Sequence, residues 1–161
     1  MSRLLISPRH LNAIHRHAAM TYPEECCGIL IGKHLEGGEE GAQVERVLSA
    51  HNARGDRRQD RYLIEPQTIL AAHREAQAVE LDIVGYYHSH PDHPARPSET
   101  DREFAWPGVS YIIVSVEGGE PVATRSWRLN DDRLCFREEA VFDGESSPAD
   151  LGSAERSRKA S

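Results

Sequence analysis

The chain has 161 residues, of which 39% are hydrophobic and 28% are charged, and its formal net charge is −7. This length suits a single domain, and the hydrophobic share is sufficient for one buried core. Nucleic acids and anionic membranes attract basic surfaces, so the acidic balance leads us to expect neither as a partner. No stretch of the sequence approaches the ~20 apolar residues of a membrane-spanning helix.

The cysteines are three in number, and Cys26 and Cys27 are adjacent while Cys135 stands far from them. An odd number with this spacing does not indicate a disulfide framework. The apolar run near the N-terminus is too short for a signal peptide. We therefore expect a cytoplasmic protein in a reducing environment.

The hydrophobic pattern of residues 1–90 predicts strands interleaved with helices. Strands are expected at residues 4–6, 26–31, 44–48, 62–64 and 83–87. One helix should begin at Pro8 and end before Pro23, and a second should begin at Pro66, because proline is well tolerated in the first turn. The apolar face of the second helix is expected to consist of Ile69, Leu70, Ala76 and Val79. Residues 51–61, rich in arginine and aspartate, are predicted to form a surface loop.

The second half of the chain continues with an irregular loop at 91–97, which contains three prolines. Ser98 should begin a short helix that ends near Trp106, and strands are expected at 111–116, 122–129 and 134–141. This order predicts the α/β class, with a mixed β-sheet flanked by helices. Beyond residue 142 small and charged residues dominate, so we predict one domain at 1–142 and a disordered tail at 143–161.

The chemistry is concentrated around His88 and His90, which lie at the end of a predicted strand. Residues two apart on a strand point the same way, so the two imidazoles can share a metal ion. A catalytic zinc site has three protein ligands and one open position for water. Asp101, in the first turn of the following helix, is a candidate for the third ligand.

A second His-x-His pair provides an internal comparison. His15 and His17 lie on a predicted helix, where side chains two residues apart diverge by about 200°. We therefore expect them to be partly exposed and not to share a metal ion.

A metal-dependent hydrolase also needs a group that takes a proton from water and passes it to the leaving amine. Glu24 and Glu25, directly before an apolar strand, are the best-placed carboxylates elsewhere in the chain, and periodicity alone does not choose between them. Residues 98–101 taken alone also fit a helix cap. Both roles are compatible, since Ser98 can cap the helix while Asp101 faces a metal.

Other reactive side chains have simpler interpretations. Cys27 is a conceivable nucleophile, but it lies in an apolar run where buried cysteine behaves as a small hydrophobic residue. Cys135, in a late predicted strand, is expected in the core. His93 is expected to be exposed in its loop, and Trp106 is expected to pack against the helix that it ends.

The pattern His88-x-His90-x7-Ser98-x2-Asp101 resembles the motif of the JAMM (MPN-plus) metalloproteases without a departure. The segment Glu25-Cys26-Cys27-Gly28 is similar to the Glu-x-Cys-Gly of that family and favours Glu25 over Glu24. Further similarity in residues 61–66 and 111–115 extends the resemblance over roughly residues 3 to 140.

The resemblance implies a cytidine-deaminase-like JAMM/MPN fold. It also implies Zn²⁺ bound by His88, His90 and Asp101, with Glu25 as general acid/base and Ser98 helping to stabilise the oxyanion. The implied activity is zinc-dependent hydrolysis of a peptide or isopeptide bond after the C-terminal Gly-Gly of a ubiquitin-like protein. Because a small stand-alone domain resembles the bacterial members, the expected partner is a ubiquitin-like sulfur-carrier protein.

Two alternative functions compete with this interpretation. A metal-binding MPN scaffold without peptidase activity is the first, but metal-free scaffolds have lost ligands from the motif and this chain retains every element. A zinc deaminase would carry His-x-Glu and Pro-Cys-x-x-Cys, and the sequence has neither.

Overall fold

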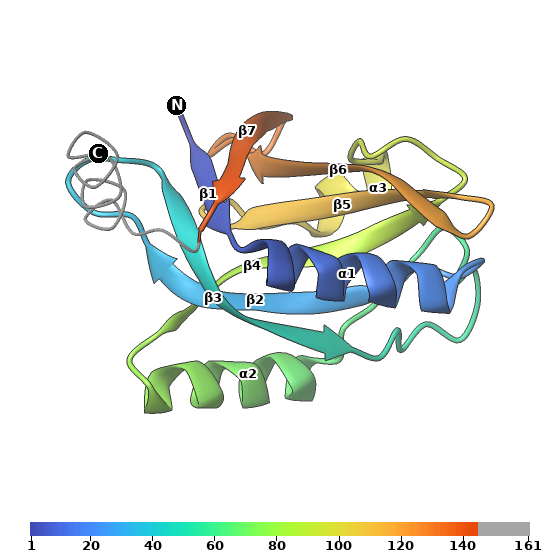
Figure 1. Ribbon diagram of the computed structural model, residues 1–161, viewed down its shortest axis with the longest axis horizontal. Helices are drawn as coiled ribbons and strands as arrows, with labels where there is room; N and C mark the ends of the chain where they lie inside the picture. The colour runs from blue at the N-terminus through green and yellow to red at the C-terminus, as the bar shows by residue number, and fades with distance from the viewer. Residues whose placement is uncertain (145–161) are drawn as a thin grey trace, which may run out of the picture.

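The computed structural model describes residues 1–144, which form seven strands and three helices. In chain order these are β1 (Arg3–Ile6), α1 (Pro8–Thr21), β2 (Cys27–His34), β3 (Gly41–Ala50), α2 (Pro66–Ala78), β4 (Asp82–Pro91), α3 (Glu99–Phe104), β5 (Ser110–Glu117), β6 (Glu120–Leu129) and β7 (Phe136–Asp143). The strands form a single curled sheet with the helices around it (Figure 1). Within this part of the chain, none of the helices is long and hydrophobic enough to cross a membrane.

The sheet has the strand order β1-β3-β2-β4-β5-β6-β7, and β1 also pairs with β7, so the sheet closes on itself. The pairs β1–β3, β1–β7 and β4–β5 are parallel, and the other pairs are antiparallel. The predicted α/β class with a mixed sheet is confirmed. The closure was not predicted, because pairing between the first and last strands leaves no local pattern in the sequence.

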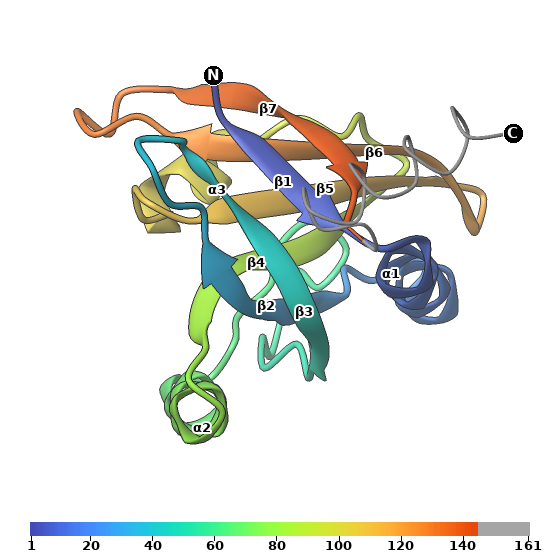
Figure 2. The ribbon, with the colours of Figure 1, turned by 60° about the vertical axis from the view of Figure 1, so that its left-hand side comes forward.

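Helices α1 and α2 pack on opposite faces of the sheet (Figure 2). Successive residues of a strand point to alternate faces of the sheet, and in β2 the residues on both faces are buried under a helix. Leu30 packs with Ile14 and Ala18 of α1, whereas Ile29 and Ile31 pack with α2. A strand covered on both faces has an unbroken apolar sequence, which is why this segment was recognisable from composition alone.

Both long helices begin as predicted, with proline in the first turn. The buried face of α2, however, was predicted only in part, since Ile69 packs against the core and Ala76 is buried as expected, whereas Leu70 and Val79 are not. Ala72 and Ala76 are buried, while Leu70 and Val79 are 50% and 42% exposed. The helix rests on the sheet through its small residues, which allow close approach, and its larger side chains remain at the surface.

Two further elements differ from the predicted ones. Residues 62–64 do not form a strand, because the N–H of Leu63 donates to the Asn52 side chain and its C=O accepts from Ala53 N. Cys135 is exposed and lies before the start of β7, so the prediction of a core cysteine was wrong. Of the predicted tail, Asp143 belongs to β7, and residues 145–161 lie outside the described part of the chain.

Candidate active site

The two histidines of the motif lie in β4, between β2 and β5 in the sheet. Both are buried, and their Nε2 atoms are 3.1 Å apart. Asp101 Oδ2 lies 3.1 Å from His90 Nε2 and 3.3 Å from His88 Nε2. A tetrahedral zinc ion with bonds of about 2.0–2.1 Å holds its ligand atoms about 3.3 Å apart, so this triangle has the size of one face of such a site.

A hydrogen bond at the far side of the His90 ring orients its free lone pair inward. His90 Nδ1 is 2.8 Å from the carbonyl oxygen of Pro94. A carbonyl oxygen can only accept a hydrogen bond, so Nδ1 carries the ring proton. The lone pair of Nε2 is therefore available to bind a cation. Burial lowers the pKa of His88, which favours its neutral form. Burial alone would raise the pKa of Asp101, but the adjacent His88 and His90 hold it well below its usual range. The three converging groups therefore suit a bound cation.

Asp101 is positioned by the cap of helix α3. Ser98 is the N-cap, its Oγ accepts from Asp101 N at 3.0 Å, and Ser98 N donates to Asp101 Oδ2 at 2.8 Å. The same carboxylate oxygen that completes this capping box also faces His88 and His90. The predicted cap is confirmed, and its geometry orients Asp101 toward the histidines.

Glu25 lies two residues before the start of β2 and is 4% exposed. Glu25, His88 and His90 can offer ligand atoms that all lie within 4.8 Å of one another, whereas Glu24 does not belong to this group. Burial, followed by the negative charges of Asp101 and Asp60, raises the pKa of Glu25 to about 9. Its Oε1 has no hydrogen-bond partner among the described residues. The side chain is thus a buried carboxyl beside the two histidines, and its raised pKa favours the protonated form at neutral pH.

Three neighbours of the site were not identified from the sequence. Ser89, between the two histidines, accepts from Cys26 N at 2.8 Å and so ties the segment after Glu25 to β4. Tyr62 stacks on His88 with ring centroids 4.6 Å apart. Asn52 donates to the carbonyl of Glu25 at 3.3 Å. Ser89 was findable, because it stands inside the motif. Asn52 comes from the segment interpreted as a surface loop, and Tyr62 comes from the predicted strand at 62–64.

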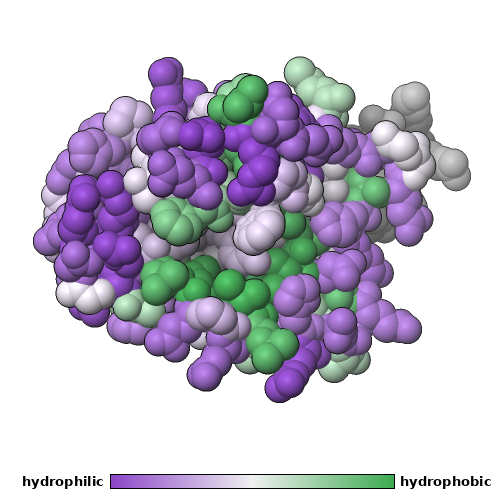
Figure 3. Space-filling model, turned by 180° about the vertical axis from the view of Figure 1, so that it is seen from behind, coloured by the Kyte–Doolittle hydropathy of each residue, from purple (hydrophilic) through white to green (hydrophobic). Residues whose placement is uncertain are grey.

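An apolar groove of about 250 Å³ lies on one side of the site, with Asp101 in its wall. Its apolar lining residues are Tyr62, Leu63, Ile64, Ile69, Tyr86, Phe104, Trp106 and Tyr111. Trp106 is 65% exposed, with the Arg133 guanidinium 5.4 Å from the centre of its ring, so the prediction that it packs against its helix was wrong. Figure 3 shows apolar side chains gathered in the middle of the face that is turned away in Figure 1.

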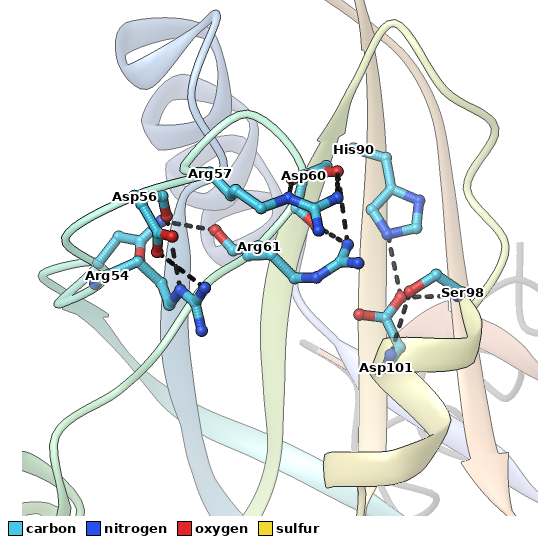
Figure 4. A network of polar contacts seen from close by, with 9 residues as sticks. Arg54, Asp56, Arg57, Asp60, Arg61, His90, Ser98 and Asp101 are labelled. Atoms are coloured by element: carbon cyan, nitrogen blue, oxygen red, sulfur yellow. Dashed lines mark hydrogen bonds and ion pairs between the residues drawn. The ribbon is translucent and has the colours of Figure 1, made fainter.

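A second cavity, also of about 250 Å³, borders the site as well and is called here the hollow. Its lining includes Glu25, His90, Ser98, Asp60, Arg61 and Arg96. Asp60 and Arg61 line both cavities. Figure 4 shows the Arg61 side chain reaching from the loop toward His90 and Asp101. The loop predicted to be plain surface thus forms the boundary between the groove and the hollow.

The remaining candidates behave largely as expected. His15 bonds to Thr124 Oγ1 at 2.6 Å and His17 to Tyr87 OH at 2.7 Å, so the helical pair diverges toward different partners. His93 is exposed, as predicted.

Cys26 and Cys27 are buried, and burial raises their pKa to about 11 and about 12. A thiolate nucleophile is therefore disfavoured, because the reactive form is scarcely populated at neutral pH.

Comparison with known proteins identifies the family. The family described as prokaryotic homologs of the JAB domain matches residues 7–130. This chain belongs to that family. The predicted membership in the JAMM (MPN-plus) group, of the stand-alone bacterial type, is confirmed, and this JAB domain is a hydrolase of the JAMM class.

Relatives of this JAB domain include two named peptidases. A desampylase from Haloferax volcanii is 33% identical over 124 residues, covering 73% of this chain and 84% of the relative. A CysO-cysteine peptidase from Mycobacterium tuberculosis is 32% identical over 129 residues, covering 80% and 84%. Among solved structures, a protein from Salinibacter ruber is 42% identical with a TM-score of 0.68, covering 88% of this chain and 92% of that one.

Proposed function

We propose that this JAB domain is a zinc-dependent peptidase that hydrolyses the bond after the C-terminal Gly-Gly of a ubiquitin-like sulfur-carrier protein. The observation that carries this proposal is the convergence of His88 Nε2, His90 Nε2 and Asp101 Oδ2 at 3.1–3.3 Å beside a buried glutamate. Two imidazole nitrogens and one carboxylate oxygen are ligands typical of catalytic zinc. His88, His90 and Asp101 would hold the ion. When bound, zinc would act as a Lewis acid and would lower the pKa of nearby water and of the Glu25 carboxyl.

The roles of the other residues follow from their positions. Glu25 accepts a proton from the attacking water and then donates it to the leaving nitrogen, because its buried carboxyl faces the site and has no competing partner at Oε1 among the described residues. Ser98 Oγ accepts from Asp101 N, which leaves its own O–H proton free to donate. That hydroxyl stabilises the negative charge that develops on the carbonyl oxygen of the scissile bond.

The substrate class is proposed from the relatives and from the shape of the site. One relative is named for cleaving CysO-cysteine and another is named a desampylase. The groove leads to a buried centre, and glycine lets a backbone approach such a centre because it has no side chain. The three free cysteines suit the reducing cytoplasm, where we place the protein. We also propose that the fold belongs to the cytidine-deaminase-like class.

The test compares two adjacent glutamates in the zinc-loaded protein. Glu25→Gln should retain zinc and the fold but reduce turnover of a Gly-Gly-extended carrier by about 10²–10⁴-fold, because an amide cannot accept the proton. Glu24→Gln is the matched control and should have a mild effect. Cleavage is measured from the masses of the products. A carrier whose terminal glycine is replaced by leucine serves as a control substrate and should not be cut. If the wild-type protein binds zinc but cuts no carrier, it is a metal-binding scaffold and the proposal is wrong.

A further inference from the structure

The rings of the two histidines in the site are held in different ways. His90 has an acceptor for its Nδ1–H, the carbonyl oxygen of Pro94 at 2.8 Å. His88 Nδ1, by contrast, is buried and has no hydrogen-bond partner among the described residues. A metal-binding histidine usually donates its second N–H to an acceptor, and that bond fixes the orientation of the ring. The His88 ring therefore needs another support.

Tyr62 supplies a flat surface against the His88 ring. The two ring centroids are 4.6 Å apart and the ring planes are inclined by 24°. This separation is at the short end of the range of about 4.5–7 Å in which aromatic pairs attract one another. Rotation about the Cβ–Cγ bond of a histidine is only weakly restricted within the side chain itself. A stacked neighbour opposes this rotation, because an imidazole that turned out of its plane would collide with the tyrosine ring.

The backbone on both sides of Tyr62 is held by one asparagine. Asn52 Nδ2 donates to the carbonyl of Arg61 at 3.0 Å, and Asn52 Oδ1 accepts from the N–H of Leu63 at 3.1 Å. Tyr62 itself packs against the core cluster that α2 covers. A ring on a backbone fixed in this way has little freedom to follow the imidazole if the imidazole turns. The stack thus keeps the ligand atom of the histidine directed at the site.

We propose that Tyr62 is a positioning residue for the metal site, and that its ring, in place of a hydrogen bond, sets the orientation of His88. This role rests on the proposed function, because it acts on a histidine assigned there to zinc. Loss of the ring should leave His88 Nε2 free to swing away from Asp101 Oδ2, which lies 3.3 Å from it. Since the stack requires only the ring, phenylalanine should replace tyrosine. Tyr62 also lines the apolar groove, but a role confined to the groove would leave metal binding unchanged.

The experiment measures the zinc affinity of the full chain by competition with a chelator, without any substrate. Tyr62→Leu should weaken zinc binding by about 10–100-fold, the usual effect of losing a residue that orients a metal ligand. Tyr62→Phe should bind zinc as the wild type does. Cobalt(II) in place of zinc gives a visible spectrum that reports the ligand geometry, and this spectrum should change in Tyr62→Leu but not in Tyr62→Phe. Tyr62→Met, another apolar replacement without a ring, gives the same test should the leucine variant fail to fold.

Tyr86→Leu is the matched control. Tyr86 also lines the groove and also stacks with its ring plane inclined by 24°, but its partner is Tyr111 and not a histidine of the site. This variant should keep the wild-type zinc affinity and cobalt spectrum, even where the free energy of unfolding of the metal-free protein falls. Equal zinc affinity in Tyr62→Leu and the wild type would overturn the proposal, as would equal weakening in Tyr62→Phe or in Tyr86→Leu. These outcomes leave the proposed function intact, whereas a wild-type protein that binds no zinc would refute the proposed function and the role of Tyr62 together.

Discussion

Single side chains decide whether the metal site exists. His88, His90 and Asp101 each supply one of the converging atoms, and catalytic zinc sites rely on three protein ligands. His88→Ala, His90→Ala and Asp101→Ala should each reduce the zinc content from one ion per chain to near zero, as measured by elemental analysis. The helical pair is the control, since His15→Ala and His17→Ala should leave the zinc content unchanged. Zinc loss in the helical variants, or no zinc in the wild type, would contradict the assignment.

The Asn52 side chain ties the loop beside the site to its neighbours. Its Nδ2 donates to the carbonyls of Glu25 and Arg61 at 3.3 and 3.0 Å, and its Oδ1 accepts from the N–H groups of Arg54 and Leu63 at 3.2 and 3.1 Å. In Asn52→Asp, a carboxylate oxygen replaces the donating Nδ2 and faces the carbonyl oxygens of Glu25 and Arg61, to which it cannot donate a hydrogen bond. The free energy of unfolding should fall by about 1–3 kcal/mol, as measured by urea denaturation.

Asn12→Asp provides the comparison for this change, because Asn12 is exposed on α1. It should alter stability by less than about 0.5 kcal/mol. A similar loss in both variants would show that Asn52 does not hold the loop.

At the scale of elements, β2 and β4 bring the two halves of the site together. Cys27 pairs with His88, and Gly28 pairs with Tyr87. A Cβ added at Gly28 would come within 2.0 Å of Tyr87 Cε1 and 2.5 Å of the Leu48 carbonyl oxygen. The glycine therefore permits the close packing that aligns Glu25 with the histidines.

Gly28→Ala should reduce the free energy of unfolding by about 1–3 kcal/mol, because Tyr87 must move to accommodate the methyl group. His88 follows Tyr87 in β4, so zinc affinity should fall as well. Both are measured on the same sample, by denaturation and by competition with a chelator. Gly55→Ala is the matched control, since a Cβ at that position meets nothing within 4 Å. An unchanged stability in Gly28→Ala would show that the sheet adapts more readily than its packing indicates.

The elements also show what the sequence could and could not predict. Strands such as β2 and β5 were recognisable because they are buried on both faces and have continuous apolar sequences. The prediction of a strand at 62–64 was wrong because the backbone N–H of Leu63 donates its hydrogen bond to the Asn52 side chain instead of to a neighbouring strand. His88, His90 and Asp101 lie within one short segment and follow from local spacing. Arg61 and Asn52 reach the site only through long-range folding, which no local pattern records.

For the whole molecule, a buried charge network stabilises the closed sheet. Arg128 of β6 bonds to Glu139 of β7 at 2.8 Å, and Glu139 also accepts from the hydroxyls of Ser2 and Ser126 at 2.5 and 2.7 Å. Burial would raise the pKa of Glu139, but the serine hydrogen bonds and the charge of Arg128 hold it below its ordinary value of about 4.5. Its ionised form therefore stabilises the fold above about pH 4.5, and this contribution is lost as the pH falls through the lower pKa of the folded state.

Glu139→Gln should lower the free energy of unfolding at pH 7 by about 3–5 kcal/mol, because it leaves Arg128 buried without its counter-charge. It should also flatten the decline of stability below pH 4.5, as measured by denaturation across a pH series. The neighbouring Glu138→Gln should change stability by less than about 1 kcal/mol, since its pair with Arg125 is half-exposed and 3.7 Å long. Equal effects of the two substitutions would contradict this account.

The pairing of β1 with β7 has a consequence for synthesis of the protein. Of the described strands, β1 is made first and β7 last, and Ser2 and Glu139, which bond directly, are 137 positions apart in the chain. A growing chain can form the hairpin of β2 and β3 early, but the first strand lacks one neighbour until the ribosome has released the last one. Until then, one edge of β1 is open to pairing with another chain. The last strand made therefore protects the newly made protein from aggregation.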